Sequence, residues 1–112
     1  MARCREPEPI VDRIIGASTD PDGKQVVLLG RVWRSKVLDD HPELEAHVDA
    51  VLHAVEAPDH TAADPVYEHR QRYYLRAAGP SRWLLVVVSY EQEPARIISA
   101  FGNRKGPRSW SR

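Results

Sequence analysis

The sequence predicts one α+β domain, in which two N-terminal helices pack on an antiparallel sheet of four to six strands. A length of 112 residues suits a single domain. Residues 33–56 carry apolar side chains at helical spacing. Residues 70–101 then contain three runs typical of strands, RQRYYLR, WLLVVVSY and ARIISAF. Helices that precede a series of strands, instead of alternating with them, indicate an α+β arrangement.

The N-terminal part predicts a flexible leader and a hairpin. Residues 1–9 are polar and contain two prolines, so we expect a leader ahead of a domain that spans residues 10–103. Residues 10–16 and 25–30 are rich in β-branched and aliphatic side chains. Between them, residues 20–23 read Asp-Pro-Asp-Gly, which has the chemistry of a turn. The two strands are therefore expected to pair as a hairpin.

Two helices are expected next. Residues 31–40 support a short helix with one apolar side, formed by Val32, Trp33, Val37 and Leu38. The second helix is expected to begin at Pro42, because proline is tolerated at the first helical position. It should end near Glu56. Its apolar stripe consists of Leu44, Val48, Val51, Leu52 and Val55.

The C-terminal half predicts most of the sheet. Residues 57–68 form a polar loop with room for one short edge strand. Side chains alternate along the next strand, with Arg70, Arg72, Tyr74 and Arg76 on one face. The run from Leu84 to Val88 is apolar without alternation, which is typical of a central strand covered on both faces. A last strand spans residues 96–101, and residues 104–112 are expected to form a basic tail.

Composition excludes several classes of protein. No apolar run approaches the length of a transmembrane helix, and the N-terminus has no apolar stretch typical of a secretory signal. Cys4 is the single cysteine, so an internal disulfide and a cysteine-rich zinc site are excluded. A cytoplasmic location is the expectation that follows. No pair of histidines has the spacing of a zinc site, and we expect neither a metal nor a cofactor.

The net charge of zero conceals a strong asymmetry along the chain. Residues 1–68 hold 7 Lys and Arg against 14 Asp and Glu, whereas residues 69–112 hold 9 against 2. A basic C-terminal half can attract an anionic partner such as RNA. The alternative is that the acidic half packs beside the basic half, so that the two fields partly cancel.

The order of motifs resembles that of the barnase-like nucleases of phages and mobile elements, a group within the barnase–colicin–RelE superfamily. The resemblance covers roughly residues 25–103. Its motifs are Trp33, Leu38, His41-Pro42-Glu43-Leu44, Pro58-Asp59, Tyr73-Tyr74, residues 84–88 and residues 97–101. It implies helices packed against a four-stranded antiparallel sheet and RNA cleavage without metal or cofactor. Ser99 stands where threonine is more usual in this group.

The resemblance also implies roles for individual residues. Cleavage through the 2′-hydroxyl of RNA needs an acid and base and cations around the phosphate. His41 is the expected acid/base, Arg72 and Arg76 the expected phosphate clamp, and Tyr74 and Ser99 the assisting groups. The expected substrate-binding residues are Arg70, Asn103, Arg104 and Lys105.

A structural explanation stands beside each of these roles. His41 can cap the second helix, the arginines can form a solvated sheet face, and Ser99 can be a hydroxyl at the edge of the core. Residues 103–105 can equally belong to a solubilising tail.

Two functions follow from these readings. The first is a metal-independent endoribonuclease, either a toxin or a phage-derived effector, with RNA as substrate and a cognate antitoxin or immunity protein as partner. The second is a non-catalytic domain of the same fold that binds RNA or protein in an immunity or accessory role. The mechanism in which Arg72 and Arg76 hold the cleaved phosphate requires His41 to lie close to them in space.

Overall fold

The chain begins with a hairpin that ends in a tight turn. In the computed structural model, which describes residues 13–76 and 82–103, strand β1 (Ile14–Thr19) pairs antiparallel with β2 (Gln25–Leu29). The Asp20 carboxylate accepts hydrogen bonds from the backbone N–H groups of residues 22 and 24 at 2.9 and 2.7 Å. Gly23 supplies the positive φ, 91°, that this turn needs. The predicted hairpin is confirmed, and its first strand continues past Gly16 to Thr19.

The first helical segment leaves β2 directly. It consists of α2 (Gly30–Val32), a wider π-helical turn (Trp33–Val37) and α3 (Leu38–Asp40). Trp33 and Val37 point into the core and are 5% and 2% exposed. The helix predicted over residues 31–40 is confirmed.

The second helix is shorter than predicted. Residues Pro42–Leu44 form a single 3-10 turn, and the α-helix α4 covers Val48–Glu56. The expected continuous helix from Pro42 is therefore wrong. The reason is local: the Leu44 N–H bonds the His41 carbonyl and the His47 N–H bonds the Leu44 carbonyl at 2.8 Å, so the short turn satisfies the backbone by itself.

The sheet has six strands in the order β1-β2-β6-β5-β4-β3. The remaining strands are β3 (His60–Ala63), β4 (Arg70–Arg76), β5 (Trp83–Ser89) and β6 (Ala95–Asn103). Neighbours are antiparallel with one exception, since β2 runs parallel to β6 where residues 26–27 meet residues 95–96. The predicted purely antiparallel sheet is therefore wrong. The helices and strands β3 to β5 separate β2 from β6 along the chain, so no hairpin joins these two strands. The direction of β6 is set instead by the antiparallel pairing of β3, β4, β5 and β6 in order.

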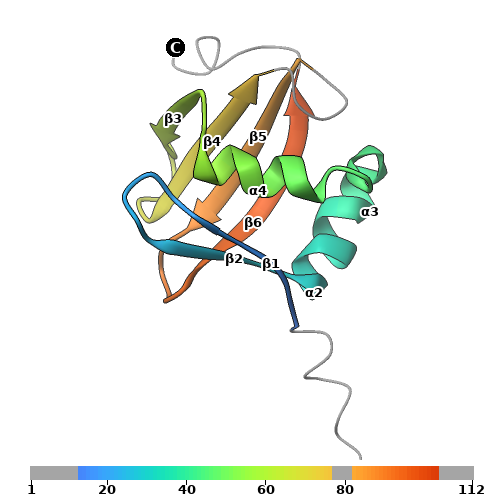
Figure 1. The fold of residues 1–112 in the computed structure, drawn as a ribbon, viewed down its shortest axis with the longest axis horizontal. Coiled ribbons are helices and arrows are strands. Elements are labelled where there is room, and N and C mark those ends of the chain that lie inside the picture. Colours follow the sequence, from blue (N-terminus) through green and yellow to red (C-terminus); the bar gives the residue numbers. More distant parts are fainter. Residues whose placement is uncertain (1–12, 77–81, 104–112) are drawn as a thin grey trace, which may run out of the picture.

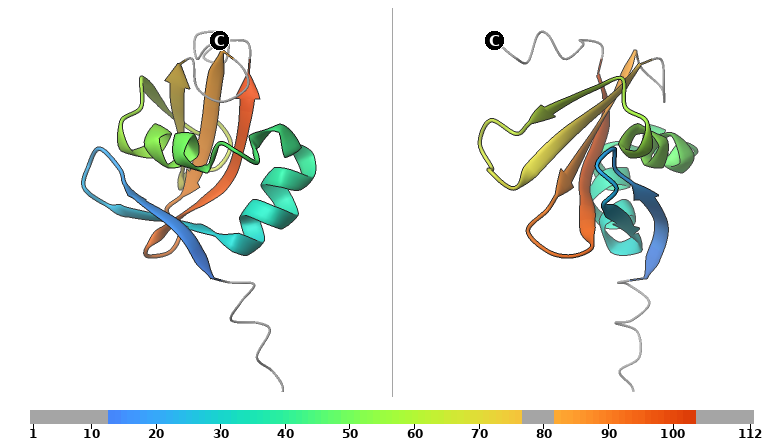
Figure 2. Two further views of the ribbon diagram at one scale, coloured as in Figure 1. Left: turned by 45° about the vertical axis from the view of Figure 1, so that its right-hand side comes forward. Right: turned by 60° about the vertical axis from the view of Figure 1, so that its left-hand side comes forward.

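Both helical segments cover the same face of the sheet, as Figures 1 and 2 show. Leu84, Val86 and Val88 of β5 face the helices in the main core, and Leu85 and Val87 belong to a smaller cluster on the opposite face. The predicted burial of β5 on both faces is confirmed. Neither helical segment among residues 13–76 and 82–103 has the length and apolar content to span a membrane.

Strand β6 has two irregular features that shape the opposite face. Its pairing with β5 shifts between Val87 and Val88, which leaves Ile98 as an extra residue in a bulge. Its pairing with β2 covers only residues 95 and 96. Beyond that point the helical segment of residues 30–40 lies beside β6 instead of a strand (Figure 1).

The core between α4 and β5 predicts a stability test. Leu84 is completely buried in the main cluster, so Leu84→Ala should lower the free energy of unfolding by about 2–5 kcal/mol through lost burial and the cavity left behind. Urea titration followed by circular dichroism measures it. The control is Val66→Ala, since Val66 is 76% exposed and its truncation should change stability by less than about 0.5 kcal/mol. Equal effects of the two changes would contradict this description of the core.

Candidate functional site

The face of the sheet opposite the helices carries the predicted site residues of the described chain in a regular grid. The strand register places the three strands β4, β5 and β6 so that positions align across them. Four rows cross this face: Arg70, Ser89 and Arg96; Arg72, Val87 and Ser99; Tyr74, Leu85 and Phe101; and Arg76 and Trp83. The backbone of Asn103 pairs with that of Trp83 at the end of β6. The predicted common face of Arg70, Arg72, Tyr74 and Arg76 is thus part of a larger surface.

His41 lies at the β6 side of this surface. Its ring stacks on the Phe101 ring with 5.6 Å between centroids and 25° between planes. Its Nδ1 atom is 3.4 Å from Oε2 of Glu43, and the two side chains are 36% and 46% exposed. The side chain makes no capping hydrogen bond to the turn that follows. His41 therefore presents an accessible imidazole whose Nδ1 side faces a carboxylate and whose Nε2 side faces away from it.

Ser99 belongs to the same neighbourhood. It is half-buried and lies two residues before Phe101 on the same face of β6, a separation of about 7 Å along the strand. The bulge at Ile98 sets this alternation, because Ile97 and Ala100 both point into the main core. The structure therefore groups His41, Phe101, Ser99 and Glu43 at one side of the face.

Arg72 lies on β4 beside a buried carboxylate. Its Nε is 3.5 Å from Oδ2 of Asp64, whose side chain is only 8% exposed. Asp64 also accepts the backbone N–H groups of Tyr67 at 3.0 Å and Val66 at 2.8 Å. The Tyr67 hydrogen bond is the main reason that the pKa of Asp64 lies below its ordinary value, and burial opposes it. Asp64 is therefore ionised at neutral pH and offsets the charge of Arg72.

Tyr74 forms part of the floor of this face. It is 1% exposed, and its ring meets the rings of His60 and Trp83 edge-on at 5.5 and 6.4 Å. Burial raises the pKa of Tyr74 above its ordinary value, and a hydrogen bond from Arg72 opposes this rise. The Tyr74 phenol therefore stays neutral at pH 7 and accepts a hydrogen bond from Arg72.

Two further arginines pack on aromatic rings at the rim. The Arg70 guanidinium lies 3.9 Å from the centre of the Tyr67 ring, and that of Arg76 lies 5.1 Å from the centre of the Trp83 ring. Such cation–π contacts hold the two guanidinium groups against the surface. Trp83 and Phe101 are themselves half-buried on this face.

The structure separates His41 from the arginine strand. Phe101, on which His41 stacks, is on β6, and Arg72 and Arg76 are on β4, with β5 between them. Two strand spacings amount to about 10 Å. The predicted acid/base and the predicted clamp thus share one face but stand at opposite sides of it. Arg104 and Lys105 lie outside the described residues, and Asn103 ends β6.

Three residues that contact the predicted site residues were not predicted from the sequence. Phe101 was noted as part of a motif and not as the platform for His41. Glu43 was likewise noted only as part of a motif, although its position two residues after His41 was the available signal. Asp64 carried no signal, because its partner Arg72 is brought to it by the pairing of β3 with β4.

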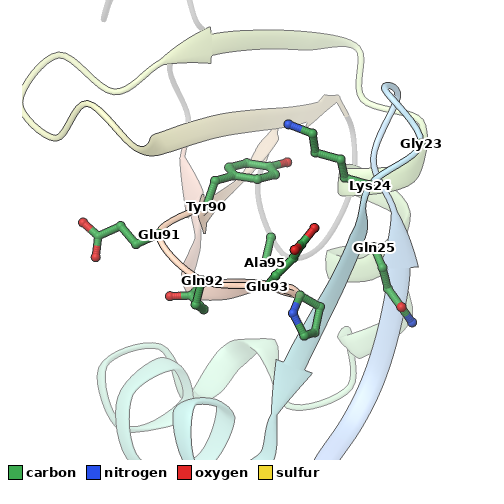
Figure 3. Close-up of a pocket in the computed structure, with 9 residues that line it drawn as sticks. Gly23, Lys24, Gln25, Tyr90, Glu91, Gln92, Glu93 and Ala95 are labelled. Carbon is green, nitrogen blue, oxygen red and sulfur yellow. The ribbon is translucent and has the colours of Figure 1, made fainter.

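A groove lies between the β1–β2 turn and the β5–β6 turn (Figure 3). Its volume is about 810 Å³, and the Lys24 ammonium stands 5.6 Å from the centre of the Tyr90 ring in its wall. Behind it the Tyr73 and Tyr90 hydroxyls are 2.6 Å apart, and the Tyr90 hydroxyl donates to Asp20 at 2.7 Å. These hydrogen bonds link the β1–β2 turn to β4 and to the end of β5. None of the predicted site residues within the described ranges lines this groove, so its size does not make it the candidate site.

The described residues form no metal site, and comparison with known proteins gives no relative. No group of three or more His, Cys, Asp or Glu side chains within residues 13–76 and 82–103 has the geometry to hold a metal ion. No protein family, curated protein or solved structure matches this chain. The roles implied by the resemblance therefore stay predictions.

The Tyr73–Tyr90–Asp20 chain predicts an alkaline transition. Burial raises the pKa of Tyr90 and that of Tyr73 above the ordinary value near 10, so the stability that these phenols contribute is present below about pH 10 and is lost as the pH rises further. Tyr90→Phe should cost about 1–3 kcal/mol at pH 7, because Asp20, 4% exposed, loses a donor. It should also make the decline above pH 10 shallower.

Denaturant titrations at several pH values from 8 to 11 measure both effects. Tyr67→Phe is the matched control, since Tyr67 is 51% exposed. Parallel alkaline declines for the wild type and Tyr90→Phe would contradict the assignment.

Proposed function

We propose that this protein is a metal-independent endoribonuclease with a barnase-like fold, which binds single-stranded RNA across the sheet face opposite the helices. One observation carries the proposal: the accessible His41 imidazole stacks on Phe101 and has the Glu43 carboxylate 3.4 Å from Nδ1, on the face that holds Ser99 and the arginines. An imidazole with one nitrogen held by a carboxylate is the arrangement used for proton transfer at the other nitrogen.

The proposed chemistry uses the RNA itself as the nucleophile. His41 removes the proton of a 2′-hydroxyl as its oxygen attacks the adjacent phosphorus, and the bond from phosphorus to the 5′-oxygen breaks as that oxygen takes a proton from solvent water. The products are a 2′,3′-cyclic phosphate and a 5′-hydroxyl. In this proposal Glu43 holds the imidazole in one orientation, and the Ser99 hydroxyl donates a hydrogen bond to a non-bridging phosphate oxygen.

The rest of the face supports binding of an unpaired strand. The guanidinium of Arg76 stands over half-buried Trp83, and this pair offers a flat surface on which a base stacks. Because His41 is two strands from β4, Arg72 and Arg76 are proposed to hold phosphates next to the one that is cleaved. Tyr74, being buried, supports these groups and does not contact RNA.

A non-catalytic RNA- or protein-binding domain is the second candidate. The observation that favours it is the offset of Arg72 by the buried carboxylate of Asp64, together with the distance of about 10 Å between the β6 and β4 sides. Salt-dependent binding of RNA without any cleavage product separates this candidate from the first.

Replacement of His41 tests the nuclease directly. His41→Ala should reduce cleavage of single-stranded RNA by about 10²–10⁴-fold, the usual contribution of a general acid or base. The assay contains a chelator and follows product formation on a gel. The unfolding free energy should change by only about 1 kcal/mol, because the substitution removes the ring contact with Phe101 but removes no capping hydrogen bond. His53→Ala, at an exposed position of α4, is the control. A fully active His41→Ala protein rules out this mechanism.

Glu43 is predicted to position His41. Glu43→Gln should lower kcat and leave KM unchanged, because the carboxylate orients the imidazole and does not contact RNA. Steady-state kinetics on a labelled oligonucleotide separate the two constants. Glu45→Gln, an exposed change in the same turn, should alter neither. A rise in KM at constant kcat would show instead that Glu43 acts on substrate binding.

A further inference from the structure

A second groove opens on the same sheet face, where β2 and β6 diverge. Its volume is about 430 Å³, within the range of small-ligand sites. Its lining residues are Ile14, Val27, Leu29, Arg31, Pro94 and Arg96. Arg96 is on the face opposite the helices, because its neighbours in β6, Ala95 and Ile97, both point into the main core.

Arg96 differs from the arginines of β4. Those of residues 70, 72 and 76 each contact a ring or a carboxylate of the chain. No hydrogen bond, ion pair or ring contact joins Arg96 to another residue within 13–76 and 82–103, and its side chain is exposed. A guanidinium at the rim of a groove whose lining, within residues 13–76 and 82–103, holds no carboxylate is suited to an anion.

The floor of the groove is apolar. Val27 and Leu29 are 3% and 7% exposed, and Ile14, which is 53% exposed, forms one wall. The occupant must therefore combine a flat or aliphatic body with a negative charge. A nucleotide has this composition, with a base for the floor and a phosphate for Arg96.

The position of the groove favours RNA over an acidic peptide. Arg96 shares a row with Ser89 and Arg70, so the groove continues the surface that holds Trp83 and Phe101. Arg96 and Phe101 pair with residues 89 and 85 of β5, four residues apart, so they are separated by about 13 Å along the strand. One strand of RNA can follow β6 between the two places, because the aromatic rings and arginines of this face suit both its bases and its phosphates, whereas an acidic peptide would use only the arginines.

We propose that the Arg96 groove is a nucleotide subsite that holds RNA several residues away from the cleaved bond. The inference rests on the RNA binding of the proposed function and not on its catalysis. It defines the substrate class as an extended single strand, because a dinucleotide at His41 does not reach a side chain about 13 Å away.

The test compares binding and cleavage in full-length proteins. Binding of a 2′-O-methyl oligonucleotide of about 12 nucleotides, which lacks the nucleophile, is followed by fluorescence anisotropy over a range of KCl concentrations. Arg96→Ala should weaken binding about tenfold and reduce the slope of log K against log salt by about 0.7, the value for one lost contact with a single strand. Dinucleotide cleavage should be unchanged.

Arg34→Ala is the matched control, because Arg34 is an exposed arginine of the helical segment. It should leave both binding and the salt slope as in the wild type. Ile14→Ser, which alters the exposed wall of the groove, should weaken binding without changing the slope.

The outcomes are distinguishable. If Arg96→Ala binds the oligonucleotide as tightly as the wild type while the wild type cleaves RNA, the subsite is wrong and the proposed function stands. If Arg96→Ala loses affinity but no protein cleaves RNA, the subsite stands and the catalytic proposal fails. Binding of an acidic peptide such as polyglutamate, with no binding of the oligonucleotide, overturns the subsite.

Discussion

The short parallel pairing between β2 and β6 is the constraint on which the candidate site depends. The two strands meet only where residues 26–27 lie beside residues 95–96, and β2 then leads into the first helical segment. This segment occupies the position beside β6 that another strand would otherwise take, and its end brings His41 to Phe101. The same divergence opens the groove at Arg96. A longer pairing would close the groove and displace His41.

Burial on both faces of β5 connects the two layers of the molecule. Leu84, Val86 and Val88 anchor the helices, while Leu85 and Val87 support the floor of the opposite face. Dense packing on one side therefore holds the register that aligns the rows on the other side. The positions of Arg72, Ser99 and Trp83 relative to one another follow from this register, although none of them belongs to the main core.

In the fold, some acidic side chains of the N-terminal half lie next to basic side chains. Asp64, from the acidic half of the sequence, offsets Arg72 from the basic half, and Glu43 lies against His41. Part of the expected cancellation between the two halves is therefore observed. Arg96 keeps its charge without such a partner in the described chain, which distinguishes the β2–β6 end of the face from the β4 end.

The sequence by itself determined the order and type of the elements, the turn at Asp20 and Gly23, and the faces of β4 and β5, since each depends on neighbouring residues through periodicity or turn chemistry. It did not determine that β2 runs parallel to β6, that the second helix is interrupted before Val48, or that Tyr74 is buried. It also could not show that His41 stands on Phe101, sixty residues later, two strands away from Arg72. These features were decided by the tertiary structure, because strand order and side-chain burial depend on which distant surfaces exclude water together, and no local pattern records that choice.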